Sequence, residues 1–486
     1  MNQDILKLEP KTIWKHFVAL NAVPRPSKKE QRVITFIKAF GSDLGLETVQ
    51  DKVGNVIIRK AATLGMEDRK TVVLQSHLDM VHQKNTSTDF DFLTQGIQMY
   101  IDGDWVKAKG TTLGADNGLG VATIMAILQS TELEHPALEA LFTIDEETGM
   151  TGAMGLEAGV LKGDILLNLD TEEDDEIGVG CAGGIDVIAS RSYMLDPTPQ
   201  SSLAYTITIR GLQGGHSGMD IHKGFANANK LMARLLCDGF DRYGLRISHI
   251  DGGSLRNAIP RECLATLVVD AVHQINFETA TAALIFAIEN EYSSIEPDLS
   301  IAINRCELPE VVMELAVQQP MLKSLQAAYD GVYRMSPDIH GLVETSNNVA
   351  RVLVDNGQCS IGCLTRSSVD SSKQDLAQAL KSTFELAGFI VEFSGEYPGW
   401  KPNMQASILN VLYDLYKKLF KSVPRVAACH AGLECGILGI HYPEMEMISF
   451  GPNIKGAHSP DERVQISSVH KFWIFIKAIL AAIPRA

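Results

Sequence analysis

The order of apolar and polar residues divides the chain into two regions, and the first of them alternates between helical and strand-like patterns. Apolar residues recur every three to four positions in 12–20 and 28–44, which predicts two amphipathic helices, and a further helix is expected at 118–128, just after a glycine-rich segment. Short continuous apolar runs predict strands: 53–59, 71–75, 137–144 and 164–169. Strands that alternate with helices indicate an α/β domain with a largely parallel sheet.

The second region begins after Gly183 and Gly184, where alternation with a period of two becomes common. It predicts strands at 185–192, 204–210, 264–271, 343–348 and 359–366. Helical patterns lie between them at 226–237 and 276–289. We therefore expect an α+β domain here. Near Tyr397 the chain leaves this domain, and a helix is predicted at 406–420.

Length and composition limit the number of domains and the possible partners, but they do not indicate which reaction the protein catalyses. A chain of 486 residues is too long for one ordinary core, so two or three domains are expected. The net charge of −16 argues against nucleic acid as a partner, because phosphate binding needs clustered basic residues. The apolar segment 472–483 is interrupted by Lys477, and no segment approaches a membrane span of roughly 20 residues.

Targeting signals and cysteines favour the cytoplasm. Residues 1–10 lack the basic start and apolar core of a secretory signal. The eight cysteines are dispersed and form no CxxC pair, so reduced thiols are expected rather than disulfides.

His77 lies three positions after the apolar run 71–74, at the expected end of a strand. Asp79 lies two positions further on, so its side chain points the same way and is placed to orient a metal-bound imidazole. The alternative is a polar strand end without metal. His82 lies beyond the strand end and is not expected to be a ligand.

Asp116 lies in a glycine-rich segment, TTLGADNGLG at 111–120. Glycines let the backbone bend and carry the carboxylate to a confined point. There it would bridge two zinc ions roughly 3.5 Å apart, the spacing of two-metal sites. An Asp-Asn turn before a helix is the simpler alternative.

Three adjacent carboxylates, Asp145, Glu146 and Glu147, follow the predicted strand 137–144. They repel one another unless a cation is near. One can bind a metal while another takes a proton from water, whose pKa a zinc ion lowers to about 7. A solvated acidic loop is the alternative.

Asp170 and His458 extend this set. Asp170 ends the apolar run 165–169, and we expect the acidic segment 172–176 after it to be a solvated loop. His458 lies in the turn GAHSPDE and would supply a second imidazole. If His458 and His77 belong to the same metal site, the C-terminal segment must complete the first domain. The second domain is then an insertion in the first.

Two further patterns carry little weight. Residues 178–183 fit GxGxxG, but they follow an acidic loop and precede a strand-like segment, so we expect a hinge rather than a dinucleotide site. Cys429 and His430 could suggest a thiol nucleophile, which a complete metal set makes unnecessary.

The chain resembles the M20 family of metallopeptidases essentially from end to end. The segments that carry the resemblance are VLQSHLDMV, KGTTLGADNGLG, DEETGM, CAGGID, LQGGHSGMDIHKG, LRNAIPRE, YPGW, HAGLECG and GAHSPDE. The resemblance implies a zinc-peptidase-type α/β catalytic domain with a mostly parallel central sheet, formed by 1–184 and 398–486. It also implies an inserted α+β lid and dimerisation domain at 185–397.

The resemblance assigns a role to each candidate residue of the first domain. It implies two Zn²⁺ per subunit, with Co²⁺ or Mn²⁺ as substitutes. His77 and Asp170 would bind one ion, Glu147 and His458 the other, and Asp116 would bridge them. Glu146 would be the general base, and Asp79 would orient His77.

In the lid, the resemblance points to His216 as the residue that stabilises the oxyanion, from the same or the neighbouring subunit. Asn257 and Arg366 would hold the substrate, Arg366 by pairing with the terminal carboxylate. Glu434 would contact the substrate amine. Asn257 as a turn cap and Glu434 as a structural residue remain alternatives. At His82 the family more often has proline, a difference that leaves the ligand set complete.

The resemblance implies a homodimeric dipeptidase that binds a small peptide, and the composition favours a cytoplasmic location with neither nucleic acid nor membrane as partner. The expected reaction is hydrolysis of Xaa-His dipeptides, including the carnosine type, β-alanyl-histidine. A related amidohydrolase of other specificity is the nearest alternative, and a non-catalytic peptide or metal binder is the alternative of another class.

Overall fold

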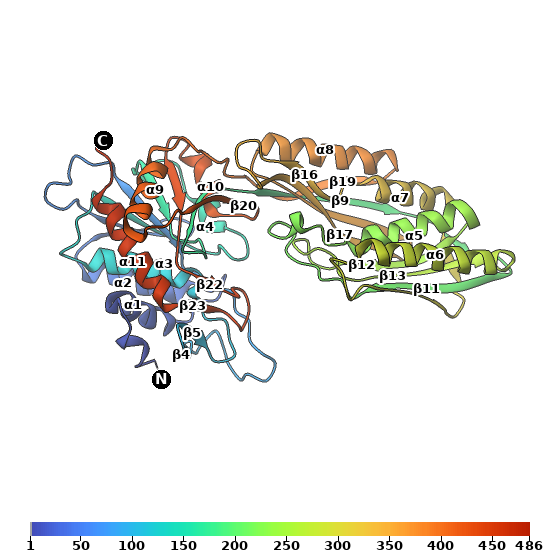
Figure 1. Cartoon of the computed structure of the whole chain (residues 1–486), viewed down its shortest axis with the longest axis horizontal. Coiled ribbons are helices and arrows are strands. Elements are labelled where there is room, and N and C mark those ends of the chain that lie inside the picture. The colour runs from blue at the N-terminus through green and yellow to red at the C-terminus, as the bar shows by residue number, and fades with distance from the viewer. Residues whose placement is uncertain (1) are drawn as a thin grey trace. The chain divides into compact units, whose positions relative to one another are not determined.

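The computed structural model of the chain describes residues 2–486, which form two compact units (Figure 1). Unit 1 contains the chain up to Gly180 together with Trp400–Ala428 and Leu433–Ala486. Unit 2 contains Cys181–Gly399 and the short segment Cys429–Gly432. The domain limits that we predict, 184/185 and 397/398, lie a few residues from these, and the segment Cys429–Gly432 was not foreseen.

Unit 1 is built on an eight-stranded sheet. Its strands, in spatial order, are β1 (Glu47–Gln50), β2 (Val56–Lys60), β6 (Leu138–Thr143), β3 (Val72–His77), β7 (Ile165–Asn168), β21 (Glu446–Ser449), β8 (Glu176–Cys181) and β20 (Arg425–Cys429). The four central strands, from β6 to β21, pair in parallel, whereas β1, β2 and β8 pair antiparallel. The predicted α/β class with a mostly parallel sheet is confirmed for the centre of the sheet.

Helices cover both faces of this sheet. They are α1 (Lys11–Asn21), α2 (Gln31–Asp43), α3 (Ala115–Gln129), α4 (Thr151–Gly155), α9 (Ser407–Phe420), α10 (Glu434–His441) and α11 (Ile466–Ala481). On one face Val73 and Leu141 pack with Leu438 of α10. On the other, α3 packs against α1 and β3. Every residue from Asn117 to Leu128 is buried, as expected for a helix that is apolar all round.

A smaller four-stranded sheet in unit 1 carries the C-terminal hairpin. Its order is β22 (Ile454–Lys455), β23 (Arg463–Gln465), β5 (Trp105–Ala108) and β4 (Met99–Asp102). Strands β22 and β23 pair antiparallel, so His458 lies in the connection between them. His458 has a φ of 64°, a left-handed conformation that non-glycine residues adopt mainly in turns.

Unit 2 is built on an antiparallel sheet of nine strands. They are β14 (Ser300–Arg305), β11 (Ser202–Arg210), β13 (Cys263–Asp270), β12 (Arg246–Gly252), β17 (Val343–Asp355), β18 (Gln358–Ser367), β9 (Gly183–Ser192) and β19 (Ile390–Tyr397), with β16 (Gly331–Met335) also paired to β17. A separate two-stranded sheet joins β10 (Leu195–Pro197) and β15 (Val311–Met313). The segment 178–183, expected to be a hinge, continues β8 and enters β9, and no helix follows it.

Four helices pack on one face of the large sheet of unit 2: α5 (Ala228–Tyr243), α6 (Gln274–Tyr292), α7 (Leu315–Ala327) and α8 (Asp370–Leu386). Alternate strand residues such as Ile207 and Ile361 join these helices in one core. Thr206, next to Ile207, is partly exposed, and Ile188 of β9 is 38% exposed. The alternation that predicted strands here thus reflects a sheet with one covered face.

No helix among residues 2–486 has the length and the apolar content that crossing a bilayer requires.

Candidate metal centre

Three of the predicted site residues come from the carboxyl ends of neighbouring parallel strands in unit 1. His77 is the last residue of β3 and lies opposite Thr143, the last residue of β6. Glu147 follows β6, and Asp170 follows β7 two residues after its end. Because parallel strands end at the same edge of a sheet, their loops bring these side chains together.

Asp116 reaches the same edge from the start of α3. Its backbone is not helical, with φ −79° and ψ 111°. One carboxylate oxygen, Oδ1, lies 3.1 Å from Nε2 of His77, and Oδ2 lies 3.3 Å from Nε2 of His458. The carboxylate therefore lies between the two imidazoles.

Two groups of potential ligands share Asp116. The ligand atoms of His77, Asp116 and Asp170 lie within 4.8 Å of one another. Those of Asp116, Glu147 and His458 do so as well. The structure thus brings together all five residues predicted as ligands.

The separations inside these groups fit tetrahedral zinc. Ligand atoms about 2.1 Å from a tetrahedral ion lie roughly 3.4 Å from each other. Nε2 of His77 lies 3.5 Å from Oδ1 of Asp170, and Nε2 of His458 lies 2.9 Å from Oε2 of Glu147. Imidazole and carboxylate are also the ligand types that zinc takes at catalytic sites.

The electrostatics of the centre favour a cation. Burial raises the pKa of Glu146 well above its usual range, and it also raises the pKa values of Glu147 and Asp170. Burial alone would lower the pKa of His77, but Asp170 and other nearby carboxylates outweigh it and raise that pKa. Contacts with Asp116 and Glu147 raise the pKa of His458 to about 11. Crowded buried carboxylates are relieved by protons or by metal ions.

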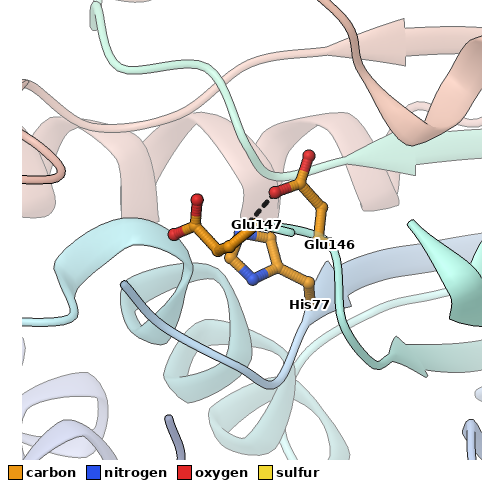
Figure 2. A group of neighbouring side chains, drawn as sticks. All are labelled: His77, Glu146 and Glu147. Atoms are coloured by element: carbon orange, nitrogen blue, oxygen red, sulfur yellow. Dashed lines mark ion pairs between the residues drawn. The ribbon is translucent and has the colours of Figure 1, made fainter. Parts of the chain in front are cut away.

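Glu146 lies beside the ligands. Figure 2 shows its side chain with those of His77 and Glu147, and the dashed line marks the 3.9 Å between Oε2 of Glu146 and Nε2 of His77. Its side chain is 12% exposed. This largely buried carboxylate next to potential metal ligands has the placement that a general base needs.

Asp79 is fully buried next to His77. Its Oδ1 lies 3.4 Å from Nδ1 of His77, an ion-pair distance that is long for a hydrogen bond. The arrangement matches the expectation that a carboxylate orients the imidazole.

Glu434 lies at the N-terminus of α10 and is 1% exposed. Gln75 and Thr143 both donate to its Oε2 at 2.6 Å. Its Oε1 accepts no hydrogen bond from residues 2–486, and burial raises its pKa to about 8. Glu434 is thus a buried acid whose contact with a substrate amine stays a prediction.

The acidic loop after Asp170 is less solvated than we predict. Glu172 is half-buried, and burial together with Asp116 raises its pKa to about 8. Glu172 is held against the C-terminal hairpin, because its carbonyl accepts the N–H of Ile454 at the start of β22. The expectation of a freely solvated loop is therefore wrong at Glu172.

The three predicted lid residues lie in unit 2. Nδ1 of His216 accepts the N–H groups of Gly218 and Met219, at 3.1 and 3.0 Å, so the neutral ring carries its proton on Nε2. Asn257 is exposed, and its carbonyl accepts the N–H of Ser217 at 2.8 Å.

Arg366 is 4% exposed and makes no ion pair among the described residues of the chain. It donates from Nη1 to the hydroxyl of Tyr397 at 2.8 Å and from Nε to Ser217 at 3.4 Å. A buried guanidinium without a carboxylate partner is suited to an anion. Tyr397 escaped the sequence analysis, because nothing in YPGW indicates a hydrogen bond to a distant arginine.

His82 and Cys429 stay outside the candidate chemistry. His82 is exposed, with its ring 5.9 Å from that of Phe92, and it belongs to neither ligand group. The thiol of Cys429 bonds to the backbone of Ala431, and Nε2 of His430 lies 2.7 Å from the hydroxyl of Ser346.

The chain matches known hydrolases over its whole length. Cytosol non-specific dipeptidase of Escherichia coli (strain K12) is 41% identical over 481 residues, 99% of each chain. A crystal structure of aminoacylhistidine dipeptidase from Vibrio alginolyticus matches with a TM-score of 0.91 and 45% identity, covering 99% of this chain and 98% of that one.

A more distant structure shares the fold alone. Human carnosine dipeptidase 1 has a TM-score of 0.51 at 11% identity, covering 99% of this chain and 97% of that one. The model of peptidase family M20/M25/M40 matches residues 73–482. The chain therefore belongs to peptidase family M20/M25/M40 and is a hydrolase.

Proposed function

We propose that the protein is a two-zinc dipeptidase that cleaves Xaa-His dipeptides, β-alanyl-histidine among them. The observation that carries the proposal is the pair of ligand groups that share Asp116, with Glu146 beside them. The names of two relatives that span the chain, a non-specific dipeptidase and an aminoacylhistidine dipeptidase, support the substrate class.

His77 and Asp170 would hold one ion, Glu147 and His458 the other, and Asp116 would bridge the two. Zinc is the first choice for this donor set, and Co²⁺ or Mn²⁺ would substitute for it. Bound there, the ions would polarise the peptide carbonyl and lower the pKa of a water molecule to about 7.

Glu146 would take the proton of the attacking water and pass it to the amide nitrogen that leaves. A carboxylate whose pKa is raised by burial is a better proton acceptor than an exposed one, which supports this role. Asp79 would hold the ring of His77 in orientation.

The roles of the residues in unit 2 rest on their local chemistry. His216, with its proton on Nε2, would donate to the oxyanion of the tetrahedral intermediate. Arg366 would pair with the terminal carboxylate of the dipeptide, and Asn257 would add a polar contact. Glu434 would serve the substrate amine.

A homodimer is proposed through unit 2. Apart from Glu278, whose 40% exposed side chain pairs with Arg305 of β14, the exposed residues of α6 between Ile275 and Asn290 are uncharged, and Ile275 and Phe286 are 76% and 73% exposed. Helix α6 packs beside β14, an edge strand of the large sheet. An uncharged helix face next to a sheet edge is suited to a second copy of the chain. A cytoplasmic location is proposed from the name of the Escherichia coli relative.

A substrate panel with metal analysis on the same sample tests the function. Ala-His, β-Ala-His, Ala-Ala and an N-acetyl amino acid would be compared. Turnover of both histidine dipeptides well above Ala-Ala is the expected result. Equal turnover of Ala-His and Ala-Ala would favour a broad dipeptidase, and turnover of the N-acetyl compound alone would favour a deacylase. Zinc-loaded protein that hydrolyses none of the four would overturn the proposal.

A further inference from the structure

One buried carboxylate in the GAHSPDE segment, Glu462, receives four consecutive backbone N–H groups. Its Oε2 accepts from Leu113 at 2.6 Å and from Gly114 at 2.9 Å. Its Oε1 accepts from Ala115 at 2.7 Å and from Asp116 at 3.3 Å. Glu462 is 2% exposed, so the side chain fills a closed site. The four backbone N–H groups of the turn that leads into α3 therefore all bond to one carboxylate.

The opposite side of the same turn is held by Arg25, which is 1% exposed. Its Nη2 donates to the carbonyl of Gly114 at 2.5 Å. Its Nη1 donates to the carbonyls of Leu78 and Asp79, at 3.0 and 2.9 Å. Arg25 thus joins the turn that carries Asp116 to the segment that follows His77.

Glu462 also belongs to the hairpin that carries His458. Its N–H donates to the carbonyl of Ser459 at 3.1 Å, within the connection between β22 and β23. One residue is therefore bonded both to the hairpin of His458 and to the turn of Asp116. Together with Arg25, it links three segments that are far apart in sequence and that each supply a potential ligand.

We infer that Glu462 is a positioning residue for the metal pair: its carboxylate fixes the turn of Asp116 relative to the hairpin of His458. The inference rests on the metal centre proposed above and extends it to a residue that contacts no metal. Charged acceptors make the stronger hydrogen bonds to backbone N–H groups, and four donors need both oxygens. A glutamine would present an NH₂ group to two of those donors and lose their bonds.

Substitution of Glu462 removes no metal ligand, but it is expected to make the positions of the proposed ligands less fixed. Outer residues that orient metal ligands change metal affinity about 10- to 100-fold when they are substituted. A purely structural role would lower thermal stability without changing the affinity or the ligand field of the bound ion. These two readouts therefore separate positioning from general stabilisation.

The test uses the full chain as Glu462→Gln, with Asp461→Asn as matched control. Asp461 is the exposed neighbour, so its substitution removes one negative charge without touching the turn. Metal affinity would be measured by competition with a chelator. The visible spectrum of the Co²⁺-loaded protein would report the ligand geometry, and circular dichroism would report the fold of the metal-free protein.

The expected result is a metal affinity about 10- to 100-fold lower in Glu462→Gln, with an altered Co²⁺ spectrum and a metal-free fold like that of the parent. Asp461→Asn should match the parent. Parental affinity and spectrum in Glu462→Gln would overturn the inference, even if its melting temperature fell.

If Glu462→Gln does not fold, Glu462→Asp decides. It keeps the charge but is one methylene shorter, so weaker metal binding with a changed spectrum supports the inference, and parental values overturn it. These readouts need no substrate. A protein that binds metal as described but cleaves no dipeptide would contradict the proposed function and leave the role of Glu462 intact.

Discussion

The carboxylate of Asp79 accepts the backbone N–H of Glu146 at 3.0 Å. It also accepts the N–H of Glu147 at 3.2 Å, while it lies 3.4 Å from Nδ1 of His77. One fully buried side chain thus connects the imidazole at the end of β3 with the acidic loop after β6. The position of the proposed base relative to the proposed metal ligand His77 depends on this carboxylate.

Asp79→Asn is therefore expected to weaken metal binding about 10- to 100-fold, because the amide cannot accept from both N–H groups and the ring at once. Chelator competition measures the change. Asp89→Asn, at an exposed position, is the control. Parental affinity in the Asp79 variant would show that His77 is held by its packing alone.

The candidate ligands that follow the early strands could be brought together from the sequence because their signal is local. His77, Glu147 and Asp170 each follow an apolar run, and the ends of parallel strands meet. Asp116 could be singled out because glycines lie close to it on both sides. His458 gave no local signal: it was predicted as the second imidazole that a site rich in carboxylates lacked, and by the resemblance of the segment GAHSPDE.

The residues that support the site escaped prediction because their partners are backbone atoms. Arg25 bonds to carbonyls, and Glu462 bonds to N–H groups 346 to 349 residues away in sequence. Every residue has backbone N–H or carbonyl groups, so the sequence does not indicate which of them a distant side chain will contact. In unit 2, edge strands such as β14 and β19 were missed, and each of them has only one fully buried residue.

Glu146→Gln should abolish most of the turnover and leave the metal in place. General base catalysis contributes about 10²- to 10⁴-fold, so kcat should fall by that factor while KM changes little. Steady-state kinetics on β-Ala-His, with zinc content measured on the same sample, checks this. Glu157→Gln, at a surface ion pair with Lys52, should behave like the parent. Full activity in Glu146→Gln would remove Glu146 from the mechanism.

His458→Ala should lose one of the two proposed ions. The variant removes one ligand from the group of Asp116 and Glu147, while the group of His77 keeps its three. Elemental analysis after dialysis should therefore give about one zinc per chain instead of about two. His82→Ala tests a nearby exposed imidazole outside both groups and should retain the full content. An unchanged content in His458→Ala would contradict the proposed second site.

Phe286→Glu should convert the proposed dimer to a monomer. It places a charge on the uncharged face of α6, where Phe286 is 73% exposed, and a charge without a partner is costly to bury in an interface. Light scattering gives the mass in solution. Leu386→Glu, at a 91% exposed position of α8, makes the same chemical change away from that face and should stay dimeric. A parent that is already monomeric would rule out this interface.

His430 should make unit 2 sensitive to acid. Burial, together with the charge of Arg366, lowers the pKa of His430 to about 3 from its usual 6.5, and the residue is 6% exposed. Between these values the unfolded chain binds a proton that the folded chain does not. The stability from this group is therefore complete above pH 6.5 and falls by about 1.4 kcal/mol per pH unit below it.

His430→Gln keeps a polar side chain near Ser346 but cannot bind that proton. Between pH 7.5 and 5.5 the parent should lose about 1.4 kcal/mol more unfolding free energy than the variant, as measured by urea titration at both pH values. His340→Gln, at an exposed histidine of the same unit, should show the parental dependence. Equal losses in the parent and in His430→Gln would mean that folding does not lower the pKa of His430.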